Sequence, residues 1–132
     1  MASLTDTFEG IVLDHIFGIS AMTVPGSLTV KLTTTTPTDS AAGTEVSTGT
    51  WTNYSAPTIT NDGTGWSRTG NDVTNDNIID FGTATTTGDV TLLGFELWNA
   101  GTRWAWGTLA SVLVQNGNPV YFAAGDLSIT LD

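Results

Sequence analysis

Threonine is the residue type that most constrains what this chain can fold into. The 132 residues include 26 threonines and 15 glycines. Threonine is branched at Cβ and is therefore favoured in pleated strands, while glycine supplies the turns that connect them. Their joint excess predicts an all-β domain, a mainly antiparallel sandwich or barrel with short strands and many turns.

The length of the chain predicts a single domain. A chain of 132 residues lies in the usual size range of one domain and can bury about two thirds of the surface that it exposes when unfolded. No repeat of fixed period and no shift in composition marks a boundary. We therefore expect one β-rich domain over residues 1–132, with a helix at about 5–17 and strands from about 27 to 131.

Charge and cysteine content exclude several classes of function. The chain has 13 acidic and 3 basic residues, a net charge of −10, and no cysteine. Nucleic-acid binding needs clustered basic residues, whereas Lys31, Arg68 and Arg103 stand apart. The absence of cysteine excludes disulfide scaffolds, cysteine–zinc sites and thiol catalysis. No apolar run reaches the ~18 residues of a membrane span, and the N-terminus lacks the pattern of a signal peptide. We therefore expect no nucleic-acid or membrane partner and a protein made without export.

The N-terminal segment has the pattern of an amphipathic helix, because apolar residues recur there with a period of about 3.6 residues. These residues are Phe8, Ile11, Val12, Ile16 and Phe17. Asp6 and Glu9 resemble a capping box, and Thr5 is an equally good N-cap. Gly18 stands where a helix often ends. His15 lies beside the apolar stripe, which favours a surface position.

Alternating or continuous apolar residues predict strands in the rest of the chain. The predicted strands cover residues 28–32, 78–83, 90–98, 103–109, 112–114 and 127–131. Residues 51–60 are expected to contain another strand, broken near Pro57. Residues 99–102 and 116–117 predict tight turns, whereas residues 33–50 predict a long surface loop.

The segment 61–77 is the most polar part of the chain. Its aspartate and asparagine oxygens are of the kind that bind Ca²⁺, but their spacing matches no EF-hand loop. Asparagine and aspartate also favour turns, because they tolerate left-handed backbone and bond to their own main chain. Turn chemistry is the favoured interpretation, and we expect neither a metal site nor a cofactor.

The sequence carries no recognisable catalytic arrangement. Nucleotide-binding loops, HExxH and GxSxG are all missing. A single histidine makes a two-histidine metal site impossible, and the acidic residues form no evident pair of the kind that glycosidases use. Glu96 lies inside a predicted strand, where we expect it on the solvent face and paired with Arg103 across the hairpin. The chain is therefore predicted not to be an enzyme.

Aromatic residues are the candidate binding groups. Trp104 and Trp106 are two residues apart, so a regular strand would place them on one face, with Arg103, Ala105 and Gly107 on the other. Such a pair could be core, a protein interface, where tryptophan and arginine dominate binding energy, or a platform for stacking sugars. The candidate interface residues are Trp51, Tyr54, Trp66, Trp98, Arg103, Trp104 and Trp106.

Several segments resemble a family of small structural proteins of tailed bacteriophages, known as capsid decoration (cement) or tail fibre proteins. The matching segments are 28–34, 37–39, 43–47, 79–84, 88–91, 94–99, 106–109 and 122–131, so that the resemblance covers about residues 5–132. The family usually has Gly-Tyr-Ala-Arg after the Glu-Val-Ser segment. This chain has Gly49-Thr50-Trp51-Thr52-Asn53 there, so a role of that arginine does not carry over. The family implies no catalytic residue.

The resemblance implies a virion protein assembled in the host cytoplasm. We expect a capsid decoration protein that stabilises the head shell through contacts with the major capsid protein or other virion proteins and with itself, as trimers or other small oligomers. The loop 33–50 and the N-terminal helix are the elements expected to reach neighbours. The first alternative is a tail fibre or tail-tip module that binds a host glycan or surface protein. A small glycan hydrolase and a carbohydrate-binding module outside any virion are further alternatives.

Overall fold

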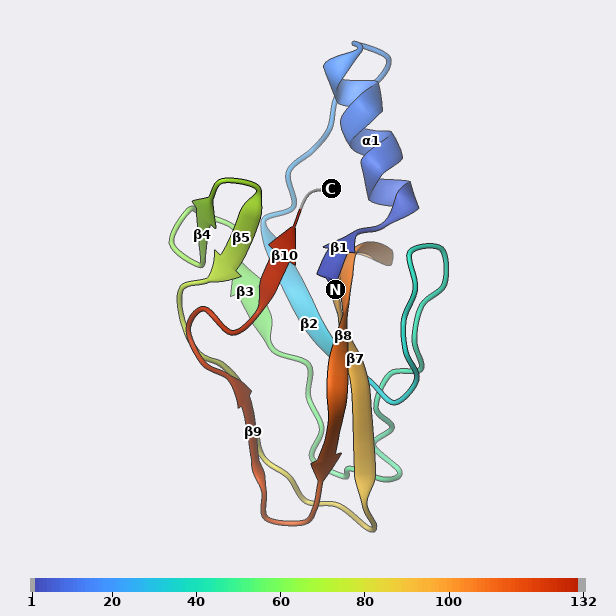
Figure 1. The fold of residues 1–132 in the computed structure, drawn as a ribbon, viewed down its shortest axis with the longest axis vertical. Helices are drawn as coiled ribbons and strands as arrows, with labels where there is room; N and C mark the ends of the chain where they lie inside the picture. The colour runs from blue at the N-terminus through green and yellow to red at the C-terminus, as the bar shows by residue number, and fades with distance from the viewer. Residues whose placement is uncertain (1, 131–132) are drawn as a thin grey trace.

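A computed structural model describes residues 2–130 of the chain, which form one helix and ten strands (Figure 1). The elements are β1 (Ala2–Leu4), α1 (Asp6–Ile16), β2 (Ser27–Thr33), β3 (Thr58–Thr60), β4 (Trp66–Thr69), β5 (Asp72–Asn75), β6 (Ile79–Thr83), β7 (Val90–Asn99), β8 (Thr102–Val114), β9 (Pro119–Phe122) and β10 (Ser128–Thr130). The predicted all-β fold with one N-terminal helix is confirmed.

The largest sheet has five antiparallel strands in the order β1-β8-β7-β2-β3. Its centre is the long hairpin of β7 and β8. The turn between them places Ala100 and Gly101 at φ 47° and 83°, and two successive residues with positive φ are the mark of a type I′ hairpin turn. The hairpin predicted at residues 99–102 is therefore confirmed.

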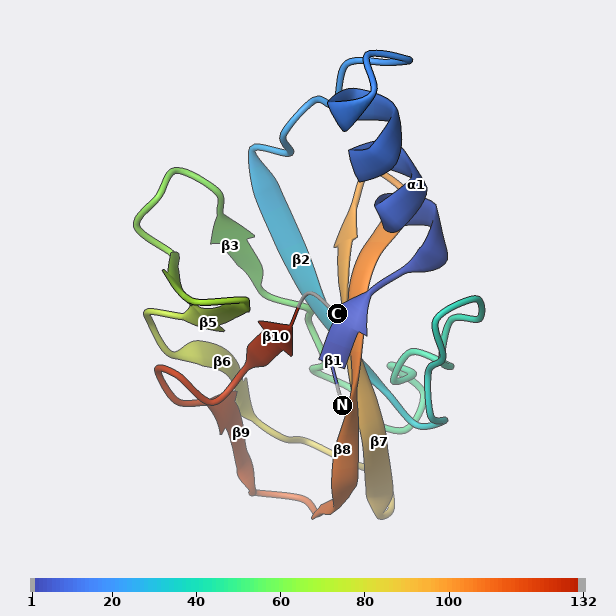
Figure 2. The same ribbon diagram turned by 45° about the horizontal axis from the view of Figure 1, so that its top comes forward.

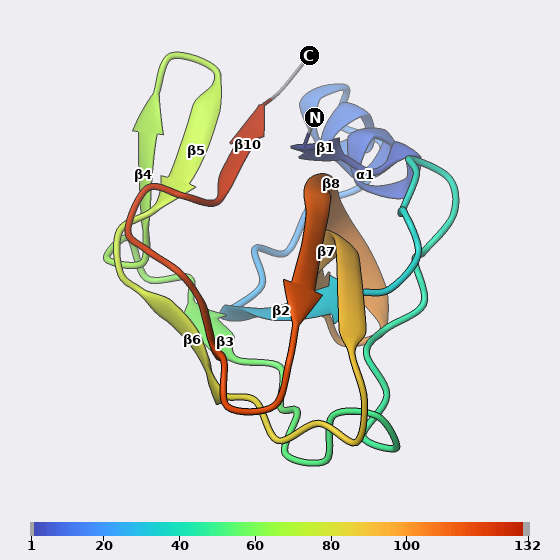
Figure 3. The ribbon, with the colours of Figure 1, turned by 60° about the horizontal axis from the view of Figure 1, so that its bottom comes forward.

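Two smaller sheets face the large one across the core. They have the orders β10-β5-β4 and β6-β9, and Figure 3 shows them opposite β7 and β8. The rings of Phe95 on β7 and Phe122 on β9 pack edge to face with centroids 5.7 Å apart. The buried apolar residues are Val30, Leu32, Val46, Trp51, Ile79, Phe81, Ala84, Val90, Leu92, Phe95, Leu97, Ala105, Val114, Leu127 and Ile129.

Several predicted boundaries are wrong, for identifiable reasons. Residues 103–109 and 112–114 belong to one strand, β8, because a bulge lets residues 109–111 lie opposite Leu93 alone. The polar segment 61–77 contains the hairpin β4–β5, and β9 was missed. Asn75 is the one buried residue in these three strands, which therefore lack an apolar pattern. The predicted final strand is present as β10, while Leu131 and Asp132 lie outside the described residues.

Helix α1 forms an arm that projects from one end of the β body (Figure 2). Thr5 is its N-cap, and the Thr5 side chain accepts a hydrogen bond from the amide of Phe8. The helix ends at Ile16, with Phe17 as its C-cap and Gly18 at φ 70° after it, so the predicted limits are confirmed to within a residue or two. None of the residues of α1 is buried.

Candidate interaction surfaces

The described residues contain no cluster suited to bind a metal. Among residues 2–130, no three histidine, aspartate or glutamate side chains come together as metal ligands. In the polar segment, Asp62 instead accepts hydrogen bonds from the hydroxyl and amide of Thr64, which lower the pKa of its carboxyl. This is the bonding of a turn.

No helix in the described part of the chain is long and apolar enough to cross a membrane.

The segment 61–77 also contains a structural residue that the sequence did not single out. The side chain of Asn75 is fully buried, donates to the carbonyls of Asn77 and Ala123, and accepts from the amide of Leu127. Asn75 thereby joins β5 to the segment that leads into β10. A buried asparagine in a polar run has no periodic pattern that would distinguish it from its exposed neighbours.

The buried ion pair of Glu96 and Arg103 fixes the loop 33–50 against the large sheet. Arg103 Nη1 lies 3.1 Å from Glu96 Oε1, and the two side chains are only 9% and 2% exposed. Arg103 also donates to the carbonyls of Asp39 and Ala41 at 2.7 and 2.9 Å. The predicted pairing of Glu96 with Arg103 is therefore confirmed. The predicted solvent exposure of Glu96 is wrong, because this loop covers the carboxylate.

The other contacts of the Glu96 carboxylate are also made to the loop 33–50 and to the strand that carries Glu96. Its carboxylate also accepts hydrogen bonds from the amide of Gly43 at 2.8 Å and from Trp98 Nε1 at 2.9 Å. Lys31 Nζ lies 5.0 Å from the centroid of the Trp98 ring and forms a 2.8 Å ion pair with Glu45. Because donors surround the buried carboxylate, its charge is compensated, and Glu96 has the environment of a structural anchor.

A β-bulge at Trp104 separates the tryptophans of β8. Leu97 is paired with Ala105 and Trp98 with Arg103, so that Trp104 is an extra residue in the ladder. Trp104 and Ala105 consequently line the same hollow on the core side, whereas Trp106 Nε1 donates to Asp39 on the face that Arg103 occupies. The prediction that Trp104 and Trp106 share one face is therefore wrong, because the bulge breaks the alternation.

Trp51 and Tyr54 belong to the interior. Trp51 has no exposed surface, and its Nε1 donates to Asn53. The ring of Tyr54 packs between Trp51 and Phe81, and its hydroxyl accepts a hydrogen bond from the amide of Leu32. Burial of the Tyr54 side chain raises the pKa of its phenol. These two predicted interface residues thus act within the fold of the single chain.

Trp66 and Trp104 line an apolar hollow of about 300 Å³ at the base of the arm. We refer to the space enclosed by the following residues as the apolar hollow: Leu4, Phe8, Met22, Val24, Pro25, Leu28, Asn61, Trp66, Val73, Leu97, Trp104, Ala105 and Ile129. The ring of Phe8 lies 4.3 Å from that of Trp104. The Nε1 atoms of both tryptophans are buried and have no hydrogen-bond partner.

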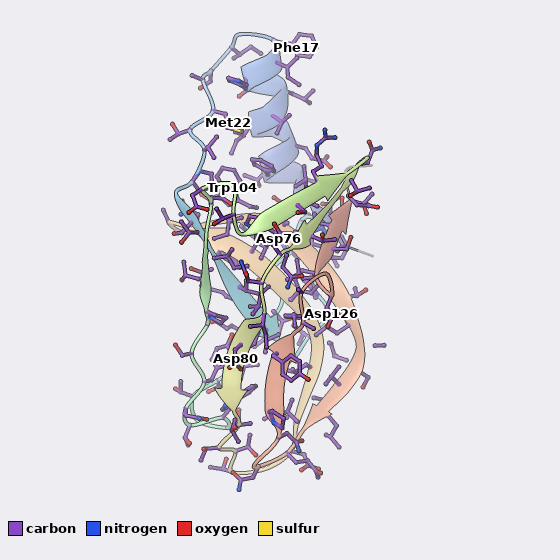
Figure 4. The ribbon with its side chains drawn as sticks, turned by 90° about the vertical axis from the view of Figure 1, so that its left-hand side faces the viewer. Phe17, Met22, Asp76, Asp80, Trp104 and Asp126 are labelled. Carbon is purple, nitrogen blue, oxygen red and sulfur yellow. The ribbon has the colours of Figure 1, made fainter. Side chains whose placement is uncertain are left out.

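The far end of the arm exposes a group of large apolar side chains, which we call the apolar tip. It consists of Leu13, Ile16, Phe17 and Ile19, with exposed fractions of 55, 67, 72 and 74%. Figure 4 shows Phe17 at the end of the arm, with Met22 beside the helix and Trp104 at its base. The sequence indicated an apolar stripe but not that its C-terminal half would lie free of the body.

A second exposed apolar patch lies where β8 ends and β9 begins. Leu113 and Tyr121 are 53% and 52% exposed there, beside a shallow depression that both residues line. Of the aspartates labelled in Figure 4, Asp126 also lines this depression. The carboxylates of Asp80 and Asp126 accept hydrogen bonds from main-chain amides of their own turns.

Comparison with known proteins identifies the family of the chain. A search of the curated proteins found no match. A protein-family model described as "Podophage GP4 fiber I protein gp80" matches residues 3–130, which is nearly the whole domain. The tailed-phage resemblance read from the sequence is thereby confirmed. The chain belongs to the podophage GP4 fiber I protein gp80 family, among the structural proteins of tailed bacteriophages.

Proposed function

We propose that this virion structural protein is a module of a phage fibre that works by contact with other proteins and not by catalysis. The observation that carries the proposal is the family match over residues 3–130, because that family is described as a fibre protein. The exposed apolar tip on a projecting arm supports it, since large apolar patches on a protein surface mark sites of protein contact.

The arrangement of the polar groups supports a non-enzymatic role. The buried charges of Glu96 and Arg103 are satisfied by each other and by the loop 33–50. The carboxylates of Asp62 and Asp80 accept hydrogen bonds from residues of their own turns. Catalytic acids and bases are instead placed where they can reach a substrate. We accordingly propose a protein without a cofactor.

Contact with proteins is favoured over stacking on a glycan. Sugar platforms require an open aromatic face, and all five tryptophans, which lie within the described residues, are buried or half-buried. Trp98 is covered by Lys31, and Trp66 and Trp104 face the apolar hollow.

We further propose that the chain associates with itself, as trimers or another small oligomer, as well as with other virion proteins.

Labelling of phage particles tests the location. Antibodies against the purified chain, detected with colloidal gold on negatively stained particles, are expected to mark the fibres. Gold spread over the heads would overturn the fibre proposal and support capsid decoration, the role favoured from the sequence. Copy number per particle, measured by quantitative mass spectrometry, gives a second readout, because a shell protein is present at every capsomer and a fibre protein only at the tail.

An assay of the purified chain on bacterial polysaccharides tests the non-enzymatic proposal. We expect no release of reducing ends by the wild-type chain. Turnover that disappears in Asp80→Asn, or in a Glu96→Gln variant whose circular dichroism is unchanged, would overturn the proposal. Turnover that persists in both variants would also overturn it and place the reaction elsewhere.

A further inference from the structure

We propose that the apolar tip of one copy inserts into the apolar hollow of a neighbouring copy, so that the chain assembles by exchanging arms. The inference rests on the self-association proposed above and names the surface that creates it. It does not depend on where in the virion the protein is located.

The tip has no partner within its own chain. Helix α1 buries none of its residues, and Phe17 and Ile19 are more than two thirds exposed. Phe17 follows Phe8 by nine positions, which corresponds to about 13 Å along a helix at 1.5 Å per residue. Because Phe8 lines the hollow, a straight helix holds the tip away from the hollow of the same copy. Only another molecule can bring the two together.

The hollow has the chemistry and the size to receive the tip. Among the described residues that line it, none is charged and only Asn61 has a polar side chain besides the two indoles. Its volume of about 300 Å³ corresponds to roughly ten groups of about 30 Å³, the volume that one water occupies in the liquid. The side chains of Phe17 and one neighbouring isoleucine together contain about that number of carbon atoms.

The two indoles of the hollow also lack a partner in the single chain. Trp66 Nε1 and Trp104 Nε1 are buried without an acceptor, and buried donors are nearly always paired in native proteins. An inserted helix end would bring the main-chain carbonyl of Ile16 as an acceptor, because the last carbonyls of a helix lack partners in its ladder and those of residues 13–15 already accept hydrogen bonds from residues 17–20. Insertion of the tip, with a small rotation of either indole, would therefore supply a hydrogen-bond acceptor for an indole N–H.

The area of the contact is limited by the hollow. Phe17 and one neighbouring isoleucine, the side chains that the hollow can hold, present roughly 300 Å² of surface, since an aromatic side chain covers about 150–250 Å². An exchange therefore buries less per copy than the about 800 Å² per partner of a standard interface, so we expect an association that depends on concentration and is strengthened where several copies meet.

Charge and symmetry are consistent with a second copy as the occupant. The net charge of −10 opposes self-association in general, but the residues that define the tip and the hollow carry no charge, so the contact joins uncharged side chains. One chain thus carries both a projection and its complementary recess. Such a heterologous contact closes into a ring or a reciprocal pair if its rotation permits.

The oligomeric state of tip variants tests the inference. Sedimentation of the purified full chain over a range of concentrations is expected to show an oligomer. In Phe17→Ser we expect roughly 30-fold weaker association, the effect of losing a central aromatic contact, and a monomer in Ile16→Ser/Phe17→Ser. Leu113→Ser is the matched control, because it removes a similarly exposed side chain from the distant patch.

The outcomes separate this inference from the proposed fibre role. An oligomer that persists unchanged in Ile16→Ser/Phe17→Ser would overturn the arm exchange alone. A monomeric wild-type chain would overturn both the exchange and the proposed self-association, whereas gold labelling would still decide the location. Circular dichroism of each variant verifies the fold, which is expected to be unchanged because these side chains are exposed in the single chain.

Cross-linking identifies the contact directly, because the chain contains no cysteine. Phe17→Cys is mixed with isotopically labelled Val24→Cys, whose site lines the hollow, and the mixture is oxidised gently. A disulfide requires Cα atoms within about 7 Å of each other, so mass spectrometry should find mixed tip–hollow pairs. A mixture with Asp89→Cys, at an exposed position on a different surface, should give none. Predominant Phe17→Cys homodimers would overturn the inference in favour of arms that bundle tip to tip.

Discussion

One arginine connects the loop 33–50 to the sheet. Arg103 bonds to Glu96 and to two main-chain carbonyls of the loop 33–50, and Glu96 holds the amide of Gly43 in the same loop. Loss of either partner would leave the other charge buried without compensation. The order of the loop is therefore determined by residues that are far from it in sequence.

Substitution of Arg103 should be among the most damaging single changes. We expect Arg103→Met to lower the free energy of unfolding by about 3–5 kcal/mol, the cost of leaving one partner of a buried ion pair alone, as measured by urea denaturation. Arg68→Met is the control, because Arg68 is exposed and its guanidinium bonds only to the carbonyl of Gly70 in its own turn. An equal loss in both variants would contradict the anchoring role of Arg103.

Tyr54 should make the fold sensitive to alkaline pH. Burial raises the pKa of its phenol, so the folded chain holds this proton more tightly than the unfolded chain, whose tyrosine titrates near pH ~10. The stability linked to Tyr54 is therefore complete below about pH 10 and declines as the pH rises above it. Denaturation at several pH values measures this decline.

The variant Tyr54→Phe isolates this effect. At neutral pH it should lose about 1–2 kcal/mol, because the amide of Leu32 no longer has its acceptor. Above about pH 10 its stability should decline less steeply than that of the wild-type chain, since the titrating phenol is gone. Parallel declines in both proteins would assign the alkaline sensitivity to other groups.

At the scale of the elements, close approach of chain segments determines where glycine is required. A Cβ atom on Gly94 would lie 2.3 Å from Pro37 Cδ, and one on Gly107 would lie 2.5 Å from the ring of Phe95 and 2.8 Å from Cβ of Ala2. Loop 33–50 packs against Gly94, whereas β1 pairs with β8 in the same sheet, with Ala2 opposite Gly107. The first glycine thus permits close covering by the loop, and the second leaves space for the Phe95 ring between neighbouring strands.

A methyl group at Gly107 should destabilise the hairpin. We expect Gly107→Ala to lower the unfolding free energy by about 1–3 kcal/mol, the range for overpacking in a tight interior, because the Phe95 ring and β1 must both move. Gly88→Ala is the matched control, since a Cβ atom added there would meet nothing within 4 Å and the φ of Gly88 is not positive. Thermal unfolding of the two variants provides the comparison.

The elements that the sequence predicted are those whose burial follows a simple period. Strands β2, β6 and β7 carry continuous or alternating buried residues, and α1 has a cap, a stripe and a terminal glycine. Strands β4 and β9 bury none of their residues, so that pairing defines them, of β4 with the neighbouring β5 and of β9 with the distant β6. Neither pairing leaves an apolar period in the sequence.

The candidate surfaces were predictable only in part. The pairing of Glu96 with Arg103 follows from their positions in a hairpin, but its burial depends on loop 33–50, which is held by contacts distant in sequence. The separation of Trp104 from Trp106 depends on one extra residue in the ladder. The hollow combines side chains from the arm, the large sheet and the small sheet, and a linear sequence gives no means to bring them together.

At the scale of the whole molecule, excess negative charge acts on stability and on assembly. The net charge of −10 is distributed over a body with three basic side chains, so repulsion within each copy and between copies opposes both folding and association. Two of the three basic groups are already occupied in ion pairs with Glu45 and Glu96. Screening by salt should therefore relieve more repulsion than it weakens attraction.

Added salt is expected to raise the melting temperature at neutral pH. Raising monovalent salt from about 0.01 to about 0.1 M shortens the Debye length from about 30 to about 10 Å. We expect Tm to increase by a few degrees, because a stabilisation of about 1 kcal/mol shifts Tm by roughly 3–6 °C in a domain of this size. Scanning calorimetry measures the shift. A matched concentration of glycerol is the control for non-ionic effects, and a fall in Tm with salt would contradict the argument.

The extra residue at Trp104 makes the sheet and its binding recess separable. The pairs Leu97–Ala105 and Trp98–Arg103 flank it on either side, so a chain shortened by this one position could keep regular pairing there with Arg103 still above Glu96. The wall of the apolar hollow that Trp104 forms would disappear. Deletion of a single codon is therefore expected to remove the proposed docking surface for the arm, while the scaffold that carries it persists.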